Sequence, residues 1–202
     1  MHLINRMTIF YKIDNKLYIN LTNACPCACV FCIRFLADSV ADTDSLWLER
    51  EPTLEEAQDA FLTQDLTHIT EIIFCGYGEP MERADDVIAL ALFMRKHTDL
   101  PFRLNTNGLG QLLHPEFDMK QLSVMDTISI SLYTTDADEY HEITKPKFGD
   151  ISFDAMLNFA KTANQYTHVV FTVLDNQSDE TIKKCQDMAN HLGISLRIRA
   201  FV

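Results

Sequence analysis

The chain has 202 residues, 47% of them hydrophobic and 23% charged, and carries a formal net charge of −12. This length and apolar content favour one compact domain over residues 1–202, with a sizeable core. The negative charge argues against a general surface for nucleic acid or anionic lipid, although it is compatible with a local basic groove.

The sequence shows neither a targeting leader nor a membrane-spanning run. Residues 1–14 lack a charged start followed by an apolar core and a small-residue cleavage site. No apolar run is long enough to cross a bilayer. We therefore expect a cytoplasmic protein whose six cysteines are reduced, so clustered cysteines indicate metal or cluster ligands rather than disulfides.

The first half of the chain alternates between predicted strands and helices. Residues 8–13 and 16–21 are expected to pair as a hairpin, and the second of these to be the first core strand. After a polar loop, Thr53 is a predicted N-cap, with Glu56 three residues later. The other predicted elements of this half are a loop, a strand, a helix and a strand, over residues 38–44, 71–74, 83–96 and 102–104.

The second half continues the alternation. Gly193 is expected to close its last helix, and residues 136–147 read as a mostly solvated, charged stretch. The predicted strands are 127–133, 169–174 and 194–202, and the predicted helices are 153–163 and 179–192. Strands alternating with helices predict an α/β fold with a parallel sheet, either an open doubly wound sheet or an incomplete barrel.

Three polar segments follow three successive core strands. They are the cysteine-rich segment 23–34, the turn 76–80 and the turn 105–108. Because ligands of such folds bind at the carboxyl ends of the strands, we expect these segments to meet at one rim.

Four cysteines within eight residues are the most informative feature of the chain. Cys25, Cys29 and Cys32 have the spacing C-x3-C-x2-C, and Cys27 offers the alternative C-x-C-x-x-C. Three thiolates suit a four-iron cluster with one iron free for a substrate or cofactor. Zinc is the main rival, although no second Cys or His pair follows, and a group of buried thiols is the plainer alternative.

These motifs together resemble the radical SAM superfamily, in order along the chain. The residues that carry the resemblance are Cys25-x3-Cys29-x2-Cys32 with Phe31, the sequence GYGEP at 76–80, NTNG at 105–108 and ISISL at 128–132. The resemblance implies an incomplete (β/α)6 TIM-like barrel, a [4Fe-4S] cluster and S-adenosylmethionine. It implies an enzyme that cleaves S-adenosylmethionine reductively and abstracts hydrogen from a substrate. Tyr77 departs from the family pattern, where many members have glycine.

The resemblance also implies roles for individual residues. Cys25, Cys29 and Cys32 would hold the cluster, leaving Cys27 as a nearby free thiol. The implied contacts of S-adenosylmethionine are Phe31 beside the adenine, Gly76 and Gly78 at a close backbone approach, Glu79 on the methionine ammonium group, and Thr106, Asn107 and Ser131. Each has a plainer alternative: a core aromatic, an ordinary glycine-rich loop, an Asn-Gly turn and a structural strand serine.

Three further residues attract attention without belonging to a motif. Arg197 and Arg199 alternate on the last predicted strand. They are expected to face solvent on an edge strand, the alternative being a cavity that binds an anion. Cys75 adjoins the predicted rim, and we expect a buried thiol there rather than a redox-active one.

The predicted function is a radical SAM enzyme whose substrate the sequence does not identify. The cysteine segment resembles a subgroup associated with TatD-family hydrolases, which makes such a hydrolase a candidate partner. A glycyl-radical activase and an enzyme acting on a modified-nucleoside precursor are two candidate reactions. The family implies flavodoxin or ferredoxin as electron donor. The competing hypothesis is a non-catalytic zinc- or cluster-binding protein.

Overall fold

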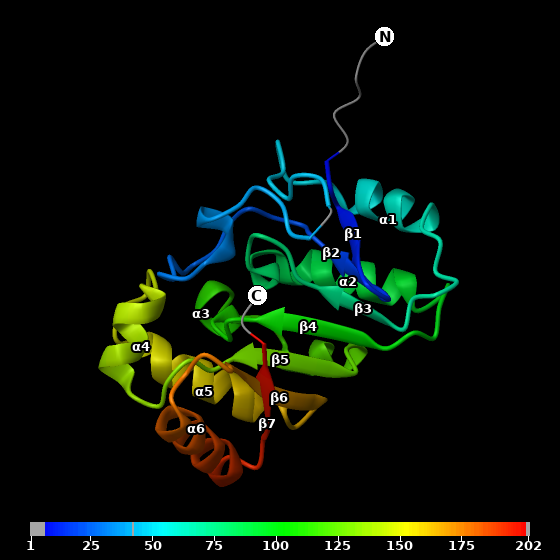
Figure 1. The fold of residues 1–202 in the computed structure, drawn as a ribbon. Coiled ribbons are helices and arrows are strands. Elements are labelled where there is room, and N and C mark those ends of the chain that lie inside the picture. The colour runs from blue at the N-terminus through cyan, green and yellow to red at the C-terminus, as the bar shows by residue number, and fades with distance from the viewer. Residues whose placement is uncertain (1–6, 42, 201–202) are drawn as a thin grey trace.

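A single curved sheet organises the chain. The computed structural model describes residues 7–41 and 43–200, so residue 42 of the predicted loop and residues 201–202 of the predicted last strand lie outside the described residues. Within the described part the strands are β1 (Phe10–Ile13), β2 (Lys16–Ile19), β3 (Glu71–Phe74), β4 (Phe102–Thr106), β5 (Thr127–Ser131), β6 (His168–Leu174) and β7 (Ser195–Arg199). They follow one another across the sheet in chain order (Figure 1).

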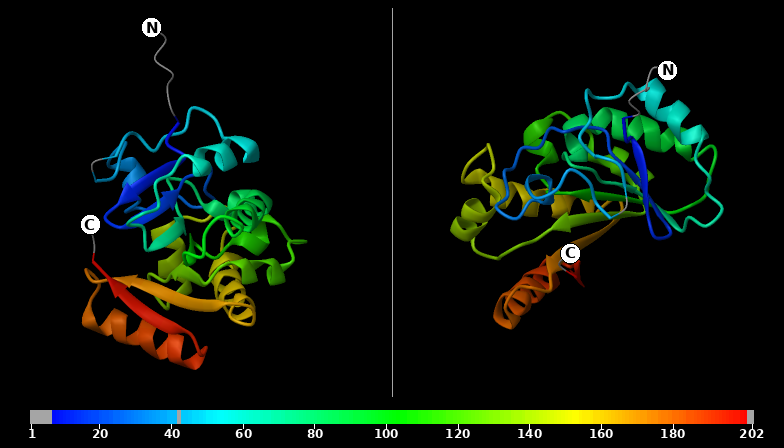
Figure 2. Two further views of the ribbon diagram at one scale, coloured as in Figure 1. Left: turned by 90° about the vertical axis from the view of Figure 1, so that its right-hand side faces the viewer. Right: turned by 45° about the horizontal axis from the view of Figure 1, so that its top comes forward.

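The first pair of strands is antiparallel and all later pairs are parallel. The helices that connect the parallel strands lie along the outer side of the sheet (Figure 2). The α-helices are α1 (Leu54–Leu62), α2 (Ala84–Met94), α3 (Gly110–Leu113), α4 (Ala137–Thr144), α5 (Ile151–Ala163) and α6 (Asp179–His191). Short 3-10 helices are η1 (Ile33–Phe35), η2 (Pro80–Arg83) and η3 (Met119–Val124). The predicted hairpin and the predicted incomplete parallel barrel are confirmed.

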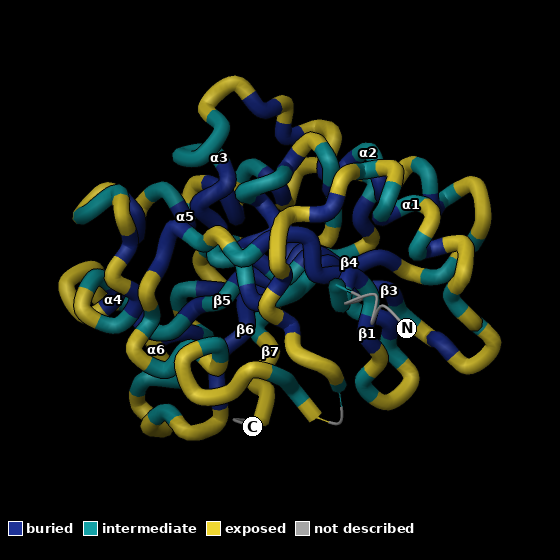
Figure 3. Tube along the Cα trace, turned by 90° about the horizontal axis from the view of Figure 1, so that it is seen from above, coloured by how far each residue is buried: buried dark blue, intermediate teal, exposed yellow. Residues whose placement is uncertain are grey.

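The two faces of the sheet have different chemistry because successive side chains point to opposite sides of a strand. The outer face is apolar and packs on the helices in one large cluster, including Ile72, Phe102, Leu104, Ile128 and Phe171. Buried residues accordingly concentrate along the strands at the centre of the molecule (Figure 3).

The inner face, which the alternation assigns to the other set of residues, is largely polar. Its side chains include Tyr18, Cys75, Arg103, Asn105, Ser129, Ser131, Thr172 and Arg197. An inward-facing polar surface at the carboxyl ends of parallel strands is where a barrel of this kind binds its ligand.

The sheet curves enough to bring its two ends together. In a flat sheet, β2 and β7 would lie about 24 Å apart, at roughly 4.8 Å per strand. Nevertheless the positive charge of Arg199 on β7 lowers the pKa of Tyr18 on β2, opposing the larger effect of burial. The hairpin and β7 lie on the same side of the molecule (Figure 2, left). The arrangement is a partial barrel with an open side between its two edge strands.

Most predicted helices are present, and one is well explained by its cap. The Thr53 hydroxyl accepts a hydrogen bond from the Glu56 amide, and the Glu56 carboxylate accepts one from the Thr53 amide, completing a capping box. Gly193, with φ of +66°, follows α6 as predicted. The predicted helix at 83–96 corresponds to α2, and η2 directly precedes it.

Residues 136–147 are mostly exposed, as predicted, but they also form a helix that the sequence analysis did not predict. The segment forms α4, whose first turn is capped by the Asp136 side chain. Tyr140 is 2% exposed and Thr144 1% exposed, so one side of this charged helix is buried. Among the described residues, no helix has the length and apolar character needed to cross a membrane.

Candidate functional site

The cysteine segment begins where β2 ends, and its first residues are bound by the turn that follows β3. The Gly78 amide donates to the Thr22 carbonyl at 3.0 Å, and the Glu79 amide donates to the Ala24 carbonyl at 2.8 Å. A Cβ atom on Gly78 would lie 2.3 Å from the first of these oxygens and 2.5 Å from the second. The glycine at this position therefore permits direct contact between two backbones.

Gly76 has a similar function two residues earlier in the same turn. A Cβ atom there would lie 2.1 Å from Oδ1 of Asn20, a fully buried residue at the end of β2. Tyr77, the departure from the family pattern, donates from its hydroxyl to the Ala37 carbonyl at 2.6 Å and packs edge-on against Trp47. The tyrosine thus anchors the long loop that follows the cysteines.

The far end of the cysteine segment is bound by residues from the end of α4. The Ala28 amide donates to the Thr144 carbonyl, and the Val30 amide to the Ile143 carbonyl, each at 3.0 Å. Cys27 forms an isolated bridge with Pro146. The segment is therefore held between the turn after β3 and the end of α4.

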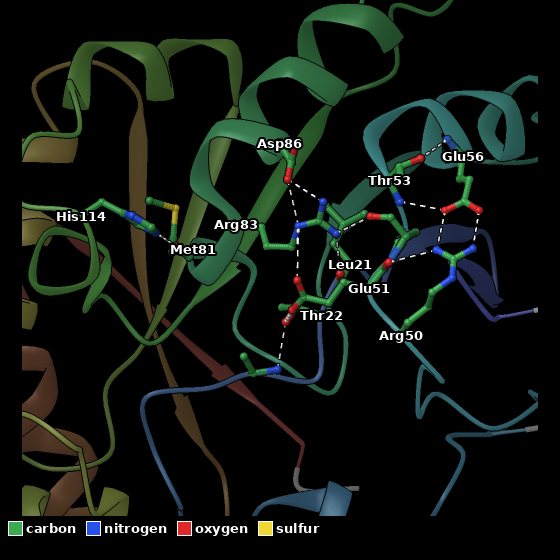
Figure 4. A network of polar contacts seen from close by, with 12 residues as sticks. Leu21, Thr22, Arg50, Glu51, Thr53, Glu56, Met81, Arg83, Asp86 and His114 are labelled. Carbon is green, nitrogen blue, oxygen red and sulfur yellow. Dashed lines mark hydrogen bonds and ion pairs between the residues drawn. The ribbon is translucent and has the colours of Figure 1, made fainter.

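A polar network fixes the base of the segment to the starts of α1 and α2 (Figure 4). Arg83 donates to the carbonyls of Leu21 and Pro52 at 3.1 and 2.6 Å, and it forms an ion pair with Asp86. The Thr22 hydroxyl donates to the Glu51 carboxylate and accepts from the Ala24 amide. The sequence analysis missed Arg83, although its position just after the GYGEP turn was a usable signal.

The four cysteine thiols lie close to one another, and all are free. A hydrogen bond from Cys27 lowers the pKa of Cys25 to about 6 and also lowers the pKa of Cys29. These bonds and burial raise the pKa of Cys27 itself, and burial raises that of Cys32. Cys27 is only 4% exposed, whereas the other three thiols are partly accessible.

Glu79 is the central acidic residue of the rim. It is 5% exposed, and burial raises its pKa to about 7. Its Oε1 accepts from the Thr106 hydroxyl at 2.7 Å and from the Met81 amide at 3.1 Å, while Oε2 accepts from the Asn107 amide at 2.8 Å. One carboxylate thereby joins the turns that follow β3 and β4.

Asn107 extends this connection to the cysteines. Its Nδ2 lies 3.9 Å from Cys25 Sγ and 3.8 Å from Cys27 Sγ, and its Oδ1 accepts from the Leu109 amide at 2.9 Å. Gly108 has φ of +79°, so the predicted Asn-Gly turn is present. Asn107 takes part both in that turn and in a contact with the thiols.

Tyr133, a residue that the sequence analysis missed, contacts both Ser131 and Phe31. Ser131 ends β5 and hydrogen-bonds to Tyr133, which counteracts the rise in the tyrosine pKa caused by burial. The Phe31 and Tyr133 rings lie 4.6 Å apart between centroids. The available signal for Tyr133 was its position two residues after Ser131.

Arg197 is exposed on the edge strand, as expected, and its side chain also reaches the inner face of the sheet. Its guanidinium group lies 3.4 Å from the Ser129 hydroxyl, two strands away across the inner face of the sheet. Curvature of the sheet turns the inner side of this edge strand towards its neighbours. Cys75 is half-buried rather than fully buried as expected. Burial raises its pKa, and its carbonyl accepts from the Tyr11 hydroxyl at 2.9 Å.

The donor set of the cysteine segment fits the implied cluster. Cys25, Cys29 and Cys32 supply three partly accessible thiols on one loop, and thiolates are the ligands that a four-iron cluster takes. Within the described residues, no three Cys, His, Asp or Glu side chains stand together as a site for a single metal ion.

Comparison with known proteins gives a consistent result. The model of the family described as the radical SAM superfamily matches residues 19–189. No curated protein that was compared matches this sequence.

Two solved structures have similar folds. TYW1 with a lysine-pyruvate adduct bound superposes with a TM-score of 0.66 at 12% identity, covering 94% of this chain and 65% of the other. For anSMEcpe with bound AdoMet the TM-score is 0.64 at 17% identity, with 92% and 49% covered. The chain thus spans about two thirds of one and half of the other, and at these identities the likeness concerns the fold.

Replacing Gly78 with alanine should disrupt the contact between the two turns. We expect Gly78→Ala to cost about 3 kcal/mol, because two backbone oxygens must move, and to reduce iron uptake during reconstitution. Gly193→Ala is the control: its Cβ would meet nothing within 4 Å, so only the backbone conformation costs about 1 kcal/mol. Denaturant unfolding and iron analysis measure both effects. Equal losses in the two variants would contradict the assigned contact.

The raised pKa of Glu79 predicts a definite pH dependence. Its carboxyl keeps its proton up to about pH 7 in the folded state, against 4.5 ordinarily. The stabilisation is therefore complete below pH 4.5 and lost as the pH rises through about 7. Relative to Glu79→Gln, the apoprotein should lose on the order of 3 kcal/mol of unfolding free energy over this range. Unfolding curves at several pH values test this, and a wild type that becomes more stable relative to Glu79→Gln as the pH rises would refute it.

Proposed function

Because this chain belongs to the radical SAM superfamily, we propose that it abstracts hydrogen from a substrate still to be identified. It is a radical SAM enzyme, and the family implies a [4Fe-4S] cluster and S-adenosylmethionine. When bound together, these two groups supply reductive cleavage of S-adenosylmethionine to a 5′-deoxyadenosyl radical. The observation that carries the proposal is the linkage of Glu79 through Asn107 to the cysteine thiols.

In this proposal the three accessible thiols hold the cluster. They are Cys25, Cys29 and Cys32, and Cys27 remains a buried thiol beside them. Arg34 donates to the carbonyls of Asn23 and Cys27 at 3.2 Å, which fixes the loop, and its positive charge favours the thiolate form of Cys25.

The remaining rim residues would hold S-adenosylmethionine. Phe31 and Ser131 lie on one side of the rim, and the Glu79 network lies on the other. Thr106 has its hydroxyl bound to Glu79, so we assign it a positioning role rather than a direct contact. Gly76 and Gly78 act in the same indirect way by bringing the turn onto the cysteine segment.

Glu79 is suited to bind an ammonium group because its carboxylate is buried and, within the part of the chain that the structure describes, forms no ion pair. Three hydrogen-bond donors orient it, yet burial still raises its pKa to about 7. A bound ammonium group would favour the ionised form and so lower that pKa. The residue would therefore bind a proton when the site is empty and a cation when it is filled.

The subgroup, the partner, the reaction class, the electron donor and the location are finer proposals that rest on the sequence and on the family. Membership of a TatD-associated subgroup, with a TatD-family hydrolase as partner, is supported only by the resemblance of the cysteine segment. The glycyl-radical activase reaction is compatible with the six cysteines of the sequence, which supply no second set of four cluster ligands. A flavodoxin or ferredoxin donor and a cytoplasmic location are family expectations that agree with free thiols.

Anaerobic reconstitution with iron and sulfide tests the proposal. We expect an absorbing four-iron cluster and formation of 5′-deoxyadenosine when reductant and S-adenosylmethionine are added. Stoichiometric zinc with no iron uptake and no cofactor cleavage would instead support the alternative, a non-catalytic zinc-binding protein.

The ligand assignment is tested by two alanine variants of neighbouring cysteines. Cys29→Ala should lose cluster binding and 5′-deoxyadenosine formation, because a thiolate ligand is removed. Cys27→Ala is the matched control and should keep both, with a higher pKa at Cys25 because its hydrogen-bond donor is gone. Iron content and absorbance measure the outcome. A cluster that survives the first change and not the second would reverse the assignment.

A further inference from the structure

Three arginines gather on the inner face of the partial barrel. They are Arg103 on β4 and Arg197 and Arg199 on β7, and we call them the inner-face arginines. Burial lowers the pKa of Arg197, and so do the charges of Arg103 and Arg199. Like charges that affect one another in this way lie close together, although β4 and β7 are three strands apart.

Arg103 is the buried member of this group. Its side chain is 6% exposed and forms an ion pair with Glu71 at 2.8 Å. Its Nε is buried and has no hydrogen-bond partner among the described residues, and Oδ1 of Asn105 on the same strand is in the same condition. A buried guanidinium donor without an acceptor is costly, which indicates that a group absent from the protein accepts this bond.

Polar hydroxyls line the space between Arg103 and β7. The Ser129 and Thr172 hydroxyls lie 2.6 Å apart, and both residues are more than nine-tenths buried. The guanidinium group of Arg197 reaches the same Ser129 hydroxyl at 3.4 Å. Hydroxyls and guanidinium groups on one surface are the donors that recognise carboxylate and phosphate oxygens.

The charge balance of this face is positive in a chain whose net charge is −12. Among the described residues, the ion pairs to these three guanidinium groups amount to one, that between Arg103 and Glu71. Arg197 and Arg199 are exposed, so they can meet a ligand that enters from the open side between the edge strands.

We propose that the inner-face arginines bind an anionic group, a carboxylate or a phosphate, of the substrate on which the radical acts. This inference rests on the proposed function, since it assigns the ligand of the inner face to the reaction at the adjoining rim. Ser129 and Thr172 would add hydrogen bonds, and Glu71 would orient Arg103. The substrate class is therefore one that carries an acidic group.

The test measures anion binding directly in the reconstituted protein. Inorganic phosphate and malonate are titrated at constant ionic strength, with chloride as the reference anion, and heat or thermal stabilisation is recorded. We expect the wild type to bind phosphate or malonate in preference to chloride, and the stronger of the two identifies the substrate's acidic group. In Arg197→Gln binding should be at least about tenfold weaker, whereas Arg50→Gln, an exposed arginine paired with Glu56 on the outer surface, should match the wild type.

Three results would overturn the inference. The first is phosphate or malonate binding that is no stronger than that of chloride, and the second is binding that is unchanged in Arg197→Gln. The third is competition, in which saturating S-adenosylmethionine abolishes anion binding, since the arginines would then serve the cofactor.

Parallel assays of 5′-deoxyadenosine formation separate this inference from the proposed function. Cofactor cleavage without anion binding refutes the anion site alone. Arginine-dependent anion binding without cofactor cleavage refutes the proposed function and the link to a substrate.

Discussion

The buried carboxylate of Glu79 is the interaction on which the rim of this barrel depends. It accepts three hydrogen bonds from two different turns, and one of its partners, Asn107, reaches the cysteine thiols. A surface carboxylate would leave each turn free to move separately. Burial makes the bonds strong and the unpaired charge costly, so the same feature that orders the rim prepares it for a cation.

The chemistry of the two sheet faces explains how a short chain combines a stable core with a polar interior. The outer face supplies the apolar surface that the helices cover. The inner face is consequently free to carry Arg103, Ser129 and Thr172, which would be destabilising in an ordinary core. Alternation along each strand keeps these two requirements apart without adding a second domain.

The sequence predicted what local patterns encode. The capping box of Thr53 and Glu56, the helix-ending Gly193 and the alternation of strands with helices all act over a few residues, and the structure contains them. What the sequence analysis missed depends on tertiary contacts. It did not predict α4, in which Tyr140 and Thr144 are the buried residues. The contact of the exposed Arg197 with Ser129 depends on a curvature that no single strand encodes.

At the candidate site too, local patterns were predicted and tertiary contacts were not. The order of the motifs placed Glu79, Asn107 and the cysteines at one rim, because parallel strands end on the same side of a sheet. The role of Gly78 required the position of Thr22 and Ala24, which spacing cannot supply. Arg83 and Tyr133 were missed for a related reason: Arg83 binds Leu21 and Tyr133 packs on Phe31, and both partners are distant in sequence.

The contacts between the cysteine segment and the end of α4 determine when, during synthesis of the chain, the segment can reach its final structure. Ala28 and Val30 are made early, but the carbonyls that accept their amide protons belong to Thr144 and Ile143. A nascent chain on the ribosome therefore exposes its cysteines long before their support has emerged. The loop that would receive iron and sulfide is therefore complete only after β5 and α4 have formed, and its thiols must stay reduced until then.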